Sequence, residues 1–323
     1  MSRPMIKVEN LVRNFGDFCA VDHLSFEIAA GEVVGFIGAN GAGKTTTMRM
    51  MTTLDIPTGG RIEIDGFDVQ NFPDPVQKIL GWMPDYFGTY ANVDVWEYLD
   101  FFARAYDLRG AARAKRIDEV MDFTDLIPLS DRPCGKISKG QKQRLCLART
   151  LLSDPKVLIL DEPAAGLDPK ARVEFRRLVQ LLQEQGKTIF ISSHILSELG
   201  EMCDNLLFID DGKLVHQGNS DSLKYSGEAF IQVEVRLLAP LVEVERWVET
   251  QAHIHLQGEM RHGVLLRLDL DAEQKLQERE VLCAALESMY QAKLKPYNFH
   301  RREQKLEDAF INMLSVKAPP LQK

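Results

Sequence analysis

The chain has 323 residues, 45% of them hydrophobic and 27% charged, which is ordinary for a globular protein with one large and one small domain. Its net charge of −8 argues against a protein that mainly binds nucleic acid, because such proteins present a basic face. No run approaches the roughly eighteen apolar residues of a membrane helix, and no apolar core with a cleavage site opens the chain, so we expect neither a membrane span nor a signal peptide. The five scattered cysteines predict free thiols in a reducing cytoplasm.

Alternating apolar residues near the N-terminus predict half-buried strands at 6–12, 24–28 and 62–64. The apolar run 33–37 predicts a buried strand, and the sequence from Thr45 onward continues like the first turns of a helix. The residues joining that strand to that helix fit the phosphate-binding pattern of glycine, four residues and Gly-Lys-Thr: Gly38, Ala39, Asn40, Gly41, Ala42, Gly43, Lys44 and Thr45.

Each residue type in this loop has a physical reason. Glycines let the backbone wrap closely around a phosphate and adopt positive φ angles. The start of the following helix presents free N–H groups and a positive dipole end to the anion. Lys44 can then reach the β- and γ-phosphates, and the Thr45 hydroxyl can ligate Mg²⁺. The alternative interpretation is a glycine-rich turn with a surface lysine.

A helical subdomain is expected at about 88–150, where apolar side chains recur at helical spacing. Beyond it, three continuous apolar runs predict strands buried on both faces, as in a parallel sheet: 157–160, 188–193 and 205–209. A helix at about 170–185 lies between the first two, which makes the layout α/β.

Two acidic residues follow the first of these buried strands directly. Asp161 is placed to hold Mg²⁺ or its water shell, and Glu162 should point toward the γ-phosphate as general base for the attacking water. The alternative interpretation of this pair is a helix N-cap.

The pattern restarts after about residue 220. Strands at 231–237 and 264–270 and helices at about 241–251 and 272–291 predict a small α+β domain over 221–316, with a further amphipathic helix at 306–314. The tail 317–323 is expected to be loose.

Four further short segments follow one another along the chain: Ser-Lys-Gly-Gln at 138–141, Leu-Ala-Arg at 147–149, Gly-Leu-Asp-Pro at 166–169 and Ser-Ser-His at 192–194. Together with the loop and the acids, they make the chain from about 5 to 220 resemble the ATP-binding subunit of an ABC transporter, most closely of the ABC-2 type, many of which are exporters. The resemblance implies a P-loop NTPase cassette over 1–220, with a mostly parallel core sheet, an antiparallel β subdomain and an α-helical subdomain.

On the matching positions, the resemblance implies an ATPase that binds ATP and Mg²⁺. Thr46 joins the phosphate loop, and Phe15 takes the place of the aromatic that stacks on adenine. Asp161 becomes the metal-site acid, Glu162 the catalytic base, and His194 the switch histidine at the γ-phosphate. Phe15 as a core residue and His194 as a satisfied structural histidine are the alternatives.

A second group of residues is expected to act across a homodimer. Ser138, Gly140 and Gln141 belong to the signature loop, which caps the γ-phosphate of ATP held by the other subunit. Asp168 lies in the loop that communicates across the dimer. Ser138 also suits a helix N-cap, and both roles can hold at once.

Two residues depart from the family pattern. Asp85 stands where the family usually has glutamine; its carboxylate can still hold Mg²⁺ through water, but it adds negative charge near the phosphates. Lys139 replaces the usual glycine of the signature loop and brings a cation toward a γ-phosphate.

The resulting hypothesis is a cytoplasmic ATPase, peripheral on the cytoplasmic face of the membrane, that drives a separate membrane-spanning permease. The permease is expected to dock between Tyr86 and about Phe102, and the C-terminal domain to stabilise or regulate the dimer. The alternatives are a soluble cassette ATPase acting on nucleic acid or ribosomes, and a P-loop kinase or other transferase; the single cassette and the acidic charge disfavour the first, and the signature segment disfavours the second.

Overall fold

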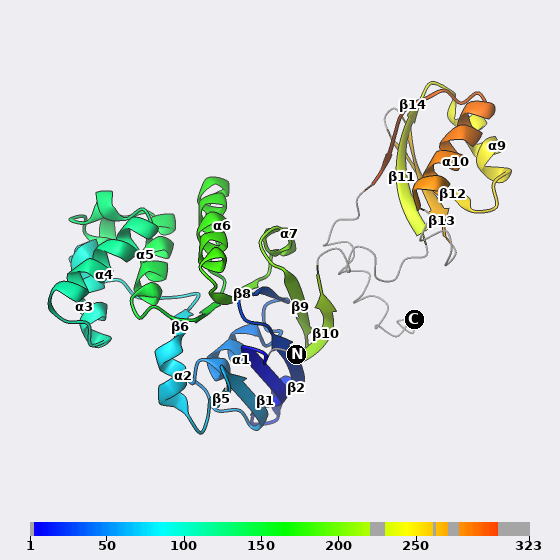
Figure 1. Ribbon diagram of the computed structural model, residues 1–323. Helices are drawn as coiled ribbons and strands as arrows, with labels where there is room; N and C mark the ends of the chain where they lie inside the picture. The colour runs from blue at the N-terminus through cyan, green and yellow to red at the C-terminus, as the bar shows by residue number, and fades with distance from the viewer. Residues whose placement is uncertain (1–2, 220–229, 261–262, 271–277, 303–323) are drawn as a thin grey trace. The chain divides into compact units, whose positions relative to one another are not determined.

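The computed structural model describes residues 3–219, 230–260, 263–270 and 278–302, and the chain divides into two compact units, Met1–Ser220 and Asp221–Lys323 (Figure 1). Within these described ranges, no helix is long and apolar enough to cross a membrane. The helix expected at 306–314 and the tail at 317–323 lie outside the described residues.

A six-stranded sheet forms the centre of the first unit. Its strands, in spatial order, are β10 (Lys213–Gly218), β9 (Asn205–Asp210), β3 (Val33–Ile37), β8 (Thr188–Ser193), β7 (Val157–Leu160) and β6 (Leu80–Met83). All neighbours pair in parallel except β9 and β10. Every residue of β3, β7 and β8 is buried, as expected of parallel strands covered on both faces.

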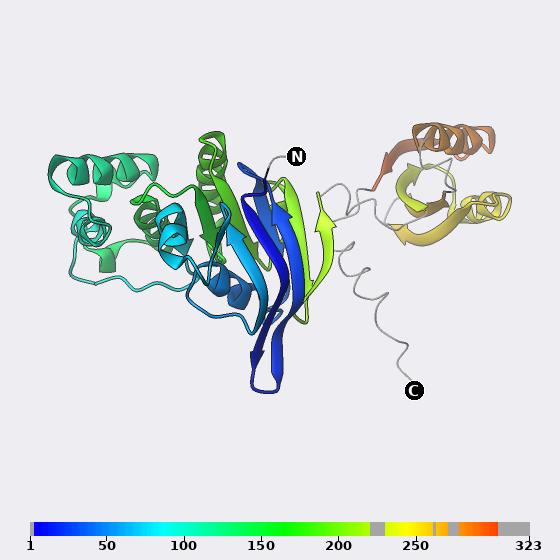
Figure 2. The same ribbon diagram turned by 60° about the horizontal axis from the view of Figure 1, so that its bottom comes forward.

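An antiparallel four-stranded sheet lies against this centre. Its spatial order is β2 (Phe18–Ile28), β1 (Ile6–Phe15), β4 (Gly59–Ile64) and β5 (Phe67–Asp68). β1 and β2 form the long blue hairpin of Figure 2, whose two-residue turn contains Gly16 at φ +59°.

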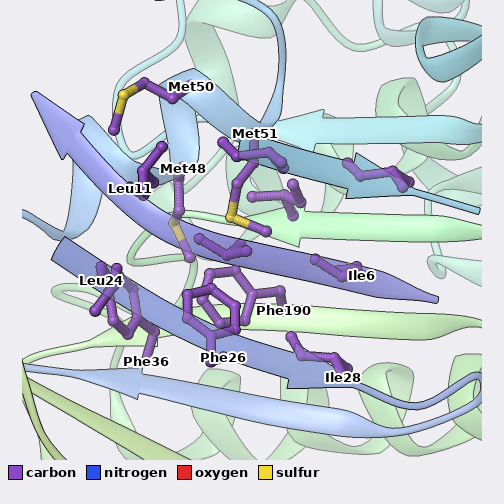
Figure 3. Close-up of a cluster of buried hydrophobic side chains, with 14 of the residues drawn as sticks. Ile6, Leu11, Leu24, Phe26, Ile28, Phe36, Met48, Met50, Met51 and Phe190 are labelled. Carbon is purple, nitrogen blue, oxygen red and sulfur yellow. The ribbon is translucent and has the colours of Figure 1, made fainter. Parts of the chain in front are cut away.

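A shared hydrophobic core joins the two sheets. Phe26 of β2 stacks on Phe190 of β8 at a ring-centroid distance of 5.5 Å, and Phe36 of β3 lies 5.0 Å from Phe190 (Figure 3). Met48 and Met51 of α1 (Lys44–Met51) belong to the same core. Burial of each such side chain contributes about 1.5–3 kcal/mol, so the strand and the helix on either side of residues 38–43 are held firmly.

The helices α3, α4 and α5 gather to one side of the sheets in Figure 1. This subdomain contains α3 (Val95–Ala105), α4 (Gly110–Phe123), η1 (Ile127–Leu129), η2 (Cys134–Lys136) and α5 (Lys139–Leu151). Asp94 caps α3 in a capping box with Glu97. The remaining helices of the first unit are α2 (Pro73–Ile79), α6 (Pro169–Glu184) and α7 (Leu196–Gly200).

The second unit has the element order of a split βαβ sandwich. Its elements are β11 (Phe230–Leu237), α9 (Leu241–Glu249), β12 (Ile254–Met260), β13 (Gly263–Asp269), α10 (Glu278–Gln291) and β14 (Pro296–Arg301). The sheet order is β12-β13-β11-β14 with antiparallel neighbours throughout. One face of the sheet packs on its own core, which includes Val233, Leu266, Trp247 and Met289.

Candidate functional site

A loop built around glycine joins β3 to α1 at residues 38–43. Gly43 has φ +104° and Gly41 φ +87°, conformations that L side chains rarely adopt. A Cβ on Gly38 would lie 2.4 Å from the Ile209 carbonyl oxygen, so only glycine allows this approach of the backbone to β9. Among the described residues, no atom beyond the adjoining chain lies within 4 Å of the place of a Cβ on Gly41, which leaves that side of the loop open. The loop therefore combines a tight turn with accessible backbone.

Lys44 is the first residue of α1, and it is only 6% exposed. The alternative interpretation of a surface lysine is therefore wrong. Its Nζ donates to the carbonyl oxygens of Gly38, at 2.8 Å, and Ala39, at 3.2 Å. The same Nζ lies 3.5 Å from Glu162 Oε1. A buried ammonium group needs such partners, because its desolvation is costly without them.

The carboxyl ends of β7 and β8 bring a serine and an acid together. Asp161 Oδ2 accepts a hydrogen bond from Thr45 Oγ1 at 2.7 Å, and its Oδ1 accepts one from Ser192 Oγ at 2.6 Å. Ser192 Oγ also accepts from the backbone N–H of Glu162 at 2.9 Å. One hydroxyl on β8 thus fixes both acids. No separate role for Ser192 was predicted; the signal that could have found it is its place at the end of a strand next to β7.

Glu162 lies between a cation and a histidine. Its Oε2 is 2.7 Å from His194 Nδ1, whereas Oε1 is buried and has no well-aligned hydrogen-bond partner in the described part of the chain. Glu162 has φ +48°, which turns the backbone sharply after β7. The alternative of a helix N-cap is wrong for this pair of acids, because the next helix is α6 and its N-cap is Asp168.

Asp85 belongs to the same cluster of charges. It follows β6, and burial raises the pKa of its carboxyl, with the nearby carboxylates of Asp161 and Glu162 adding to the rise. Lys139 and His194 are close enough to oppose this rise in the pKa. These surroundings disfavour the charged form of Asp85 relative to that of a free aspartate.

The signature loop forms the start of α5. Ser138 is its N-cap: Ser138 Oγ accepts from Gln141 N at 3.2 Å, and Gln141 Oε1 accepts from Ser138 N at 2.9 Å. This reciprocal pair is a capping box, so the N-cap interpretation of Ser138 holds. Gly140 packs close to α6, where a Cβ would lie 3.2 Å from the Ala171 side chain. The Lys139 ammonium lies against Gly166, within 2.3 Å of the place of a Cβ there.

Asp168 and Phe15 lie apart from this hydrogen-bonded cluster. Asp168 Oδ1 accepts from Ala171 N at 2.9 Å and so caps α6. Phe15 ends β1 and is 48% exposed, so its interpretation as a core residue is wrong. The Arg13 guanidinium lies over the Phe15 ring, 4.4 Å from its centroid.

The sequence is similar to curated transporter proteins. A family model described as "ABC transporter" matches residues 21–165. The bacitracin transport ATP-binding protein BcrA of Bacillus licheniformis is 40% identical over 72% of this chain and 75% of its own length. A Nod factor export ATP-binding protein I of Ralstonia nicotianae is 35% identical over 75% of this chain and 78% of its own length. The probable multidrug transporter ATP-binding protein YbhF of Escherichia coli is 37% identical over 68% of this chain, and the match spans only 38% of YbhF.

Solved structures share the fold of the first unit. cbiO1 from Clostridium perfringens, part of the transporter complex cbiONQ, superimposes with a TM-score of 0.63 and 30% identity over 70% of this chain and 92% of its own. The dimeric bacterial ABC transporter cassette MJ0796 superimposes with a TM-score of 0.61 and 26% sequence identity, over 67% of this chain and 98% of its own. These neighbours confirm the predicted fold of an ATP-binding cassette. The chain therefore belongs to the family of ABC transporter ATP-binding proteins.

Proposed function

We propose that this chain hydrolyses ATP with Mg²⁺ in a homodimer and thereby drives a separate membrane permease, in the direction of export. The observation that carries the hydrolysis is the continuous set of contacts from Thr45 through Asp161 and Ser192 to Glu162, beside the buried Lys44. Export is supported by the Nod factor relative, whose name states it, and a homodimer by the dimeric MJ0796 cassette. The acidic charge gives the nucleic-acid alternative no support.

The residues present suit a magnesium-bound triphosphate. Thr45 and Asp161 offer hydroxyl and carboxylate oxygens, the donors that Mg²⁺ prefers, and Asp85 adds a carboxylate for contact through water. When bound, Mg²⁺ neutralises charge on the β- and γ-phosphates. The open side of Gly41 and the backbone N–H groups of 38–46 suit the phosphate oxygens.

In this proposal, each side chain of the cluster has its own task in hydrolysis. Lys44 pairs with the phosphates, while His194 holds Glu162 Oε2. The remaining oxygen, Oε1, lies 3.5 Å from Lys44 Nζ and has no well-aligned hydrogen bond within the described residues, and it is the atom that would accept the proton of an attacking water. Ser138, Gly140 and Gln141 complete the pocket of the partner subunit, with the N-terminus of α5 directed at its γ-phosphate.

Two further assignments complete the nucleotide site. The exposed face of Phe15 is available to stack on adenine, and Arg13 behind it keeps the ring in place. Asp168 fixes the first turn of α6, and the loop before it meets the partner subunit.

Removal of Mg²⁺ tests the hydrolysis directly. We expect the purified chain to release inorganic phosphate from ATP when Mg²⁺ is present. EDTA should lower that rate by about a hundredfold or more, because the metal stabilises the charge that develops in the transition state by several kcal/mol. Phosphate release is followed with a coupled colorimetric assay, and added Mg²⁺ should restore the rate. Hydrolysis that persists unchanged in EDTA would contradict the proposed metal site, and transfer of phosphate to an acceptor other than water would favour the transferase alternative.

The permease is proposed to dock on exposed aromatic side chains between Tyr86 and Phe102. Tyr86, Tyr90 and Phe101 are 85%, 59% and 56% exposed, and the last two rings contact each other edge to face at 6.3 Å. Large exposed apolar side chains that cluster in this way mark interaction surfaces.

Charge placed on this surface should weaken docking. We expect the double variant Tyr90→Glu, Phe101→Glu to recover about tenfold less permease from detergent-solubilised membranes, because a buried unpaired charge is costly. Mass spectrometry must identify the captured protein as one with membrane helices. Phe72→Glu, at an equally exposed phenylalanine (55%) beside α2, is the matched control. Equal recovery with both variants would refute this docking surface.

For the second unit, we propose a role in stabilising or regulating the dimer. Deletion of residues 221–323, followed by measurement of self-association and of the ATPase rate, tests it.

A further inference from the structure

A partly buried ion pair joins α6 to α7. Arg172 Nη1 lies 2.9 Å from Glu198 Oε1, and the two side chains are 37% and 12% exposed. Arg172 stands one turn into α6, where its backbone N–H donates to the carbonyl oxygen of the N-cap Asp168 at 3.0 Å. Glu198 lies in α7, shortly after His194. The pair therefore connects the helix that follows the loop of Asp168 to the helix that follows the histidine.

From Glu198, contacts lead toward the turn that carries His194 and on to the Glu162 carboxylate. The Ser193 side chain lies close enough to Glu198 to oppose the rise in the pKa of its carboxyl. Ser193 Oγ in turn accepts from the backbone N–H of Ile195 at 3.0 Å, which fixes the turn that carries His194. His194 Nδ1 then contacts Glu162 Oε2 at 2.7 Å. The ion pair and the short backbone segment between residues 193 and 198 thus connect the start of α6 to the turn that carries His194, and His194 contacts Glu162.

This ion pair is expected to contribute little to the stability of the fold. Although Nη1 and Oε1 are close, neither Glu198 Oε1 nor Arg172 Nε has a well-aligned hydrogen bond among the described residues. Burial raises the pKa of Glu198, and Arg172 opposes that rise. Buried ion pairs with incomplete hydrogen bonding contribute little net stability, since desolvation offsets the attraction. The Arg172–Glu198 pair is therefore better suited to holding α6 and α7 in a fixed relative position than to stabilising the fold.

We propose that Arg172 and Glu198 are positioning residues, which fix the turn of His194 against the first turn of α6 and so hold the Glu162 carboxylate in its reactive orientation. This inference rests on the proposed ATP hydrolysis. It ties the conformation of the loop that ends at Asp168, which we expect to meet the partner subunit, to the orientation of the base in the same subunit.

The test is a double-mutant cycle with Glu198→Gln and Arg172→Met, which remove charge but keep most of the shape. We expect each single variant to lower kcat about tenfold with KM and the Kd for ATP within twofold, and the double variant to be no slower than either single one, because both changes break one contact. Arg172→Lys, which keeps the cation, should retain kcat within about threefold and also serves if the methionine variant folds poorly.

A second ion pair between the same elements supplies the matched control. Arg176 of α6 pairs with Glu201, the C-cap of α7, and the carboxylate there is 65% exposed. Arg176→Met and Glu201→Gln should leave kcat within twofold. Unchanged kcat in Glu198→Gln, additive losses in the cycle, or equal losses in the control pair would overturn the inference. Absence of hydrolysis in the unmodified protein would instead refute the proposed function.

Discussion

We expect Glu162→Gln to lower the rate of ATP hydrolysis by about 10²- to 10⁴-fold, the usual contribution of a general base, while ATP still binds. Glutamine keeps the volume of the side chain and can still contact His194, which lies 2.7 Å from Glu162 Oε2 in the native chain. What it lacks is a basic oxygen in place of Oε1, the atom left without a well-aligned partner in the described structure. Single-turnover phosphate release measures the loss.

The same variant should accumulate as a dimer with ATP trapped between its subunits. Size-exclusion chromatography with ATP and Mg²⁺ should show that dimer for Glu162→Gln, whereas the native chain returns to its starting state as ATP is consumed. Glu184→Gln, at an exposed position near the end of α6, is the matched control and should hydrolyse normally. Near-native turnover in Glu162→Gln would remove Glu162 from the mechanism.

The second large effect is expected from Lys44→Ala, which should weaken ATP binding by about 10- to 150-fold. This range corresponds to the 1.5–3 kcal/mol typical of a hydrogen bond to a charged group. The variant also leaves the carbonyl oxygens of Gly38 and Ala39 without their ammonium donor, so the loop itself should loosen. Titration with a fluorescent ATP analogue measures the affinity.

A lysine on the surface provides the comparison for Lys44. Lys115 is 79% exposed in its side chain and lies on α4, so Lys115→Ala should bind ATP as the native chain does. Equal affinities for Lys44→Ala and the native chain would refute the assigned contact with phosphate.

The central strands were predictable because burial on both faces leaves a continuous apolar run. The runs at β3, β7, β8 and β9 are such cases, and the sequence located all of them. The edge strands β6 and β10 were missed: Gly81 interrupts the short apolar run of β6, and β10 is largely half-exposed. In the second unit, the edge strands β12 and β14 were missed because polar residues interrupt their apolar positions and most of their side chains are exposed or half-exposed.

The site was predictable where neighbouring residues determine it and unpredictable where distant ones meet. The conformations of Gly41 and Gly43 follow from a local pattern. The bridging position of Ser192, by contrast, depends on the pairing of β7 with β8, and no local pattern encodes its contact with Asp161. From the sequence, Asp85 and Lys139 are two separate departures from the family, although the structure places Lys139 close enough to Asp85 to oppose the rise in its pKa.

The capping box at the start of α5 narrows what can occupy position 138. Ser138 Oγ accepts a hydrogen bond from the backbone N–H of Gln141, and its own hydroxyl hydrogen can still be donated. Aspartate caps helices as well as serine does, but it has no hydrogen to donate and, in the proposed dimer, would repel the phosphoryl group held by the partner subunit. Alanine would lose both the cap and the donor. Threonine keeps both the acceptor and the hydroxyl donor, so we expect it to be the most conservative replacement at position 138.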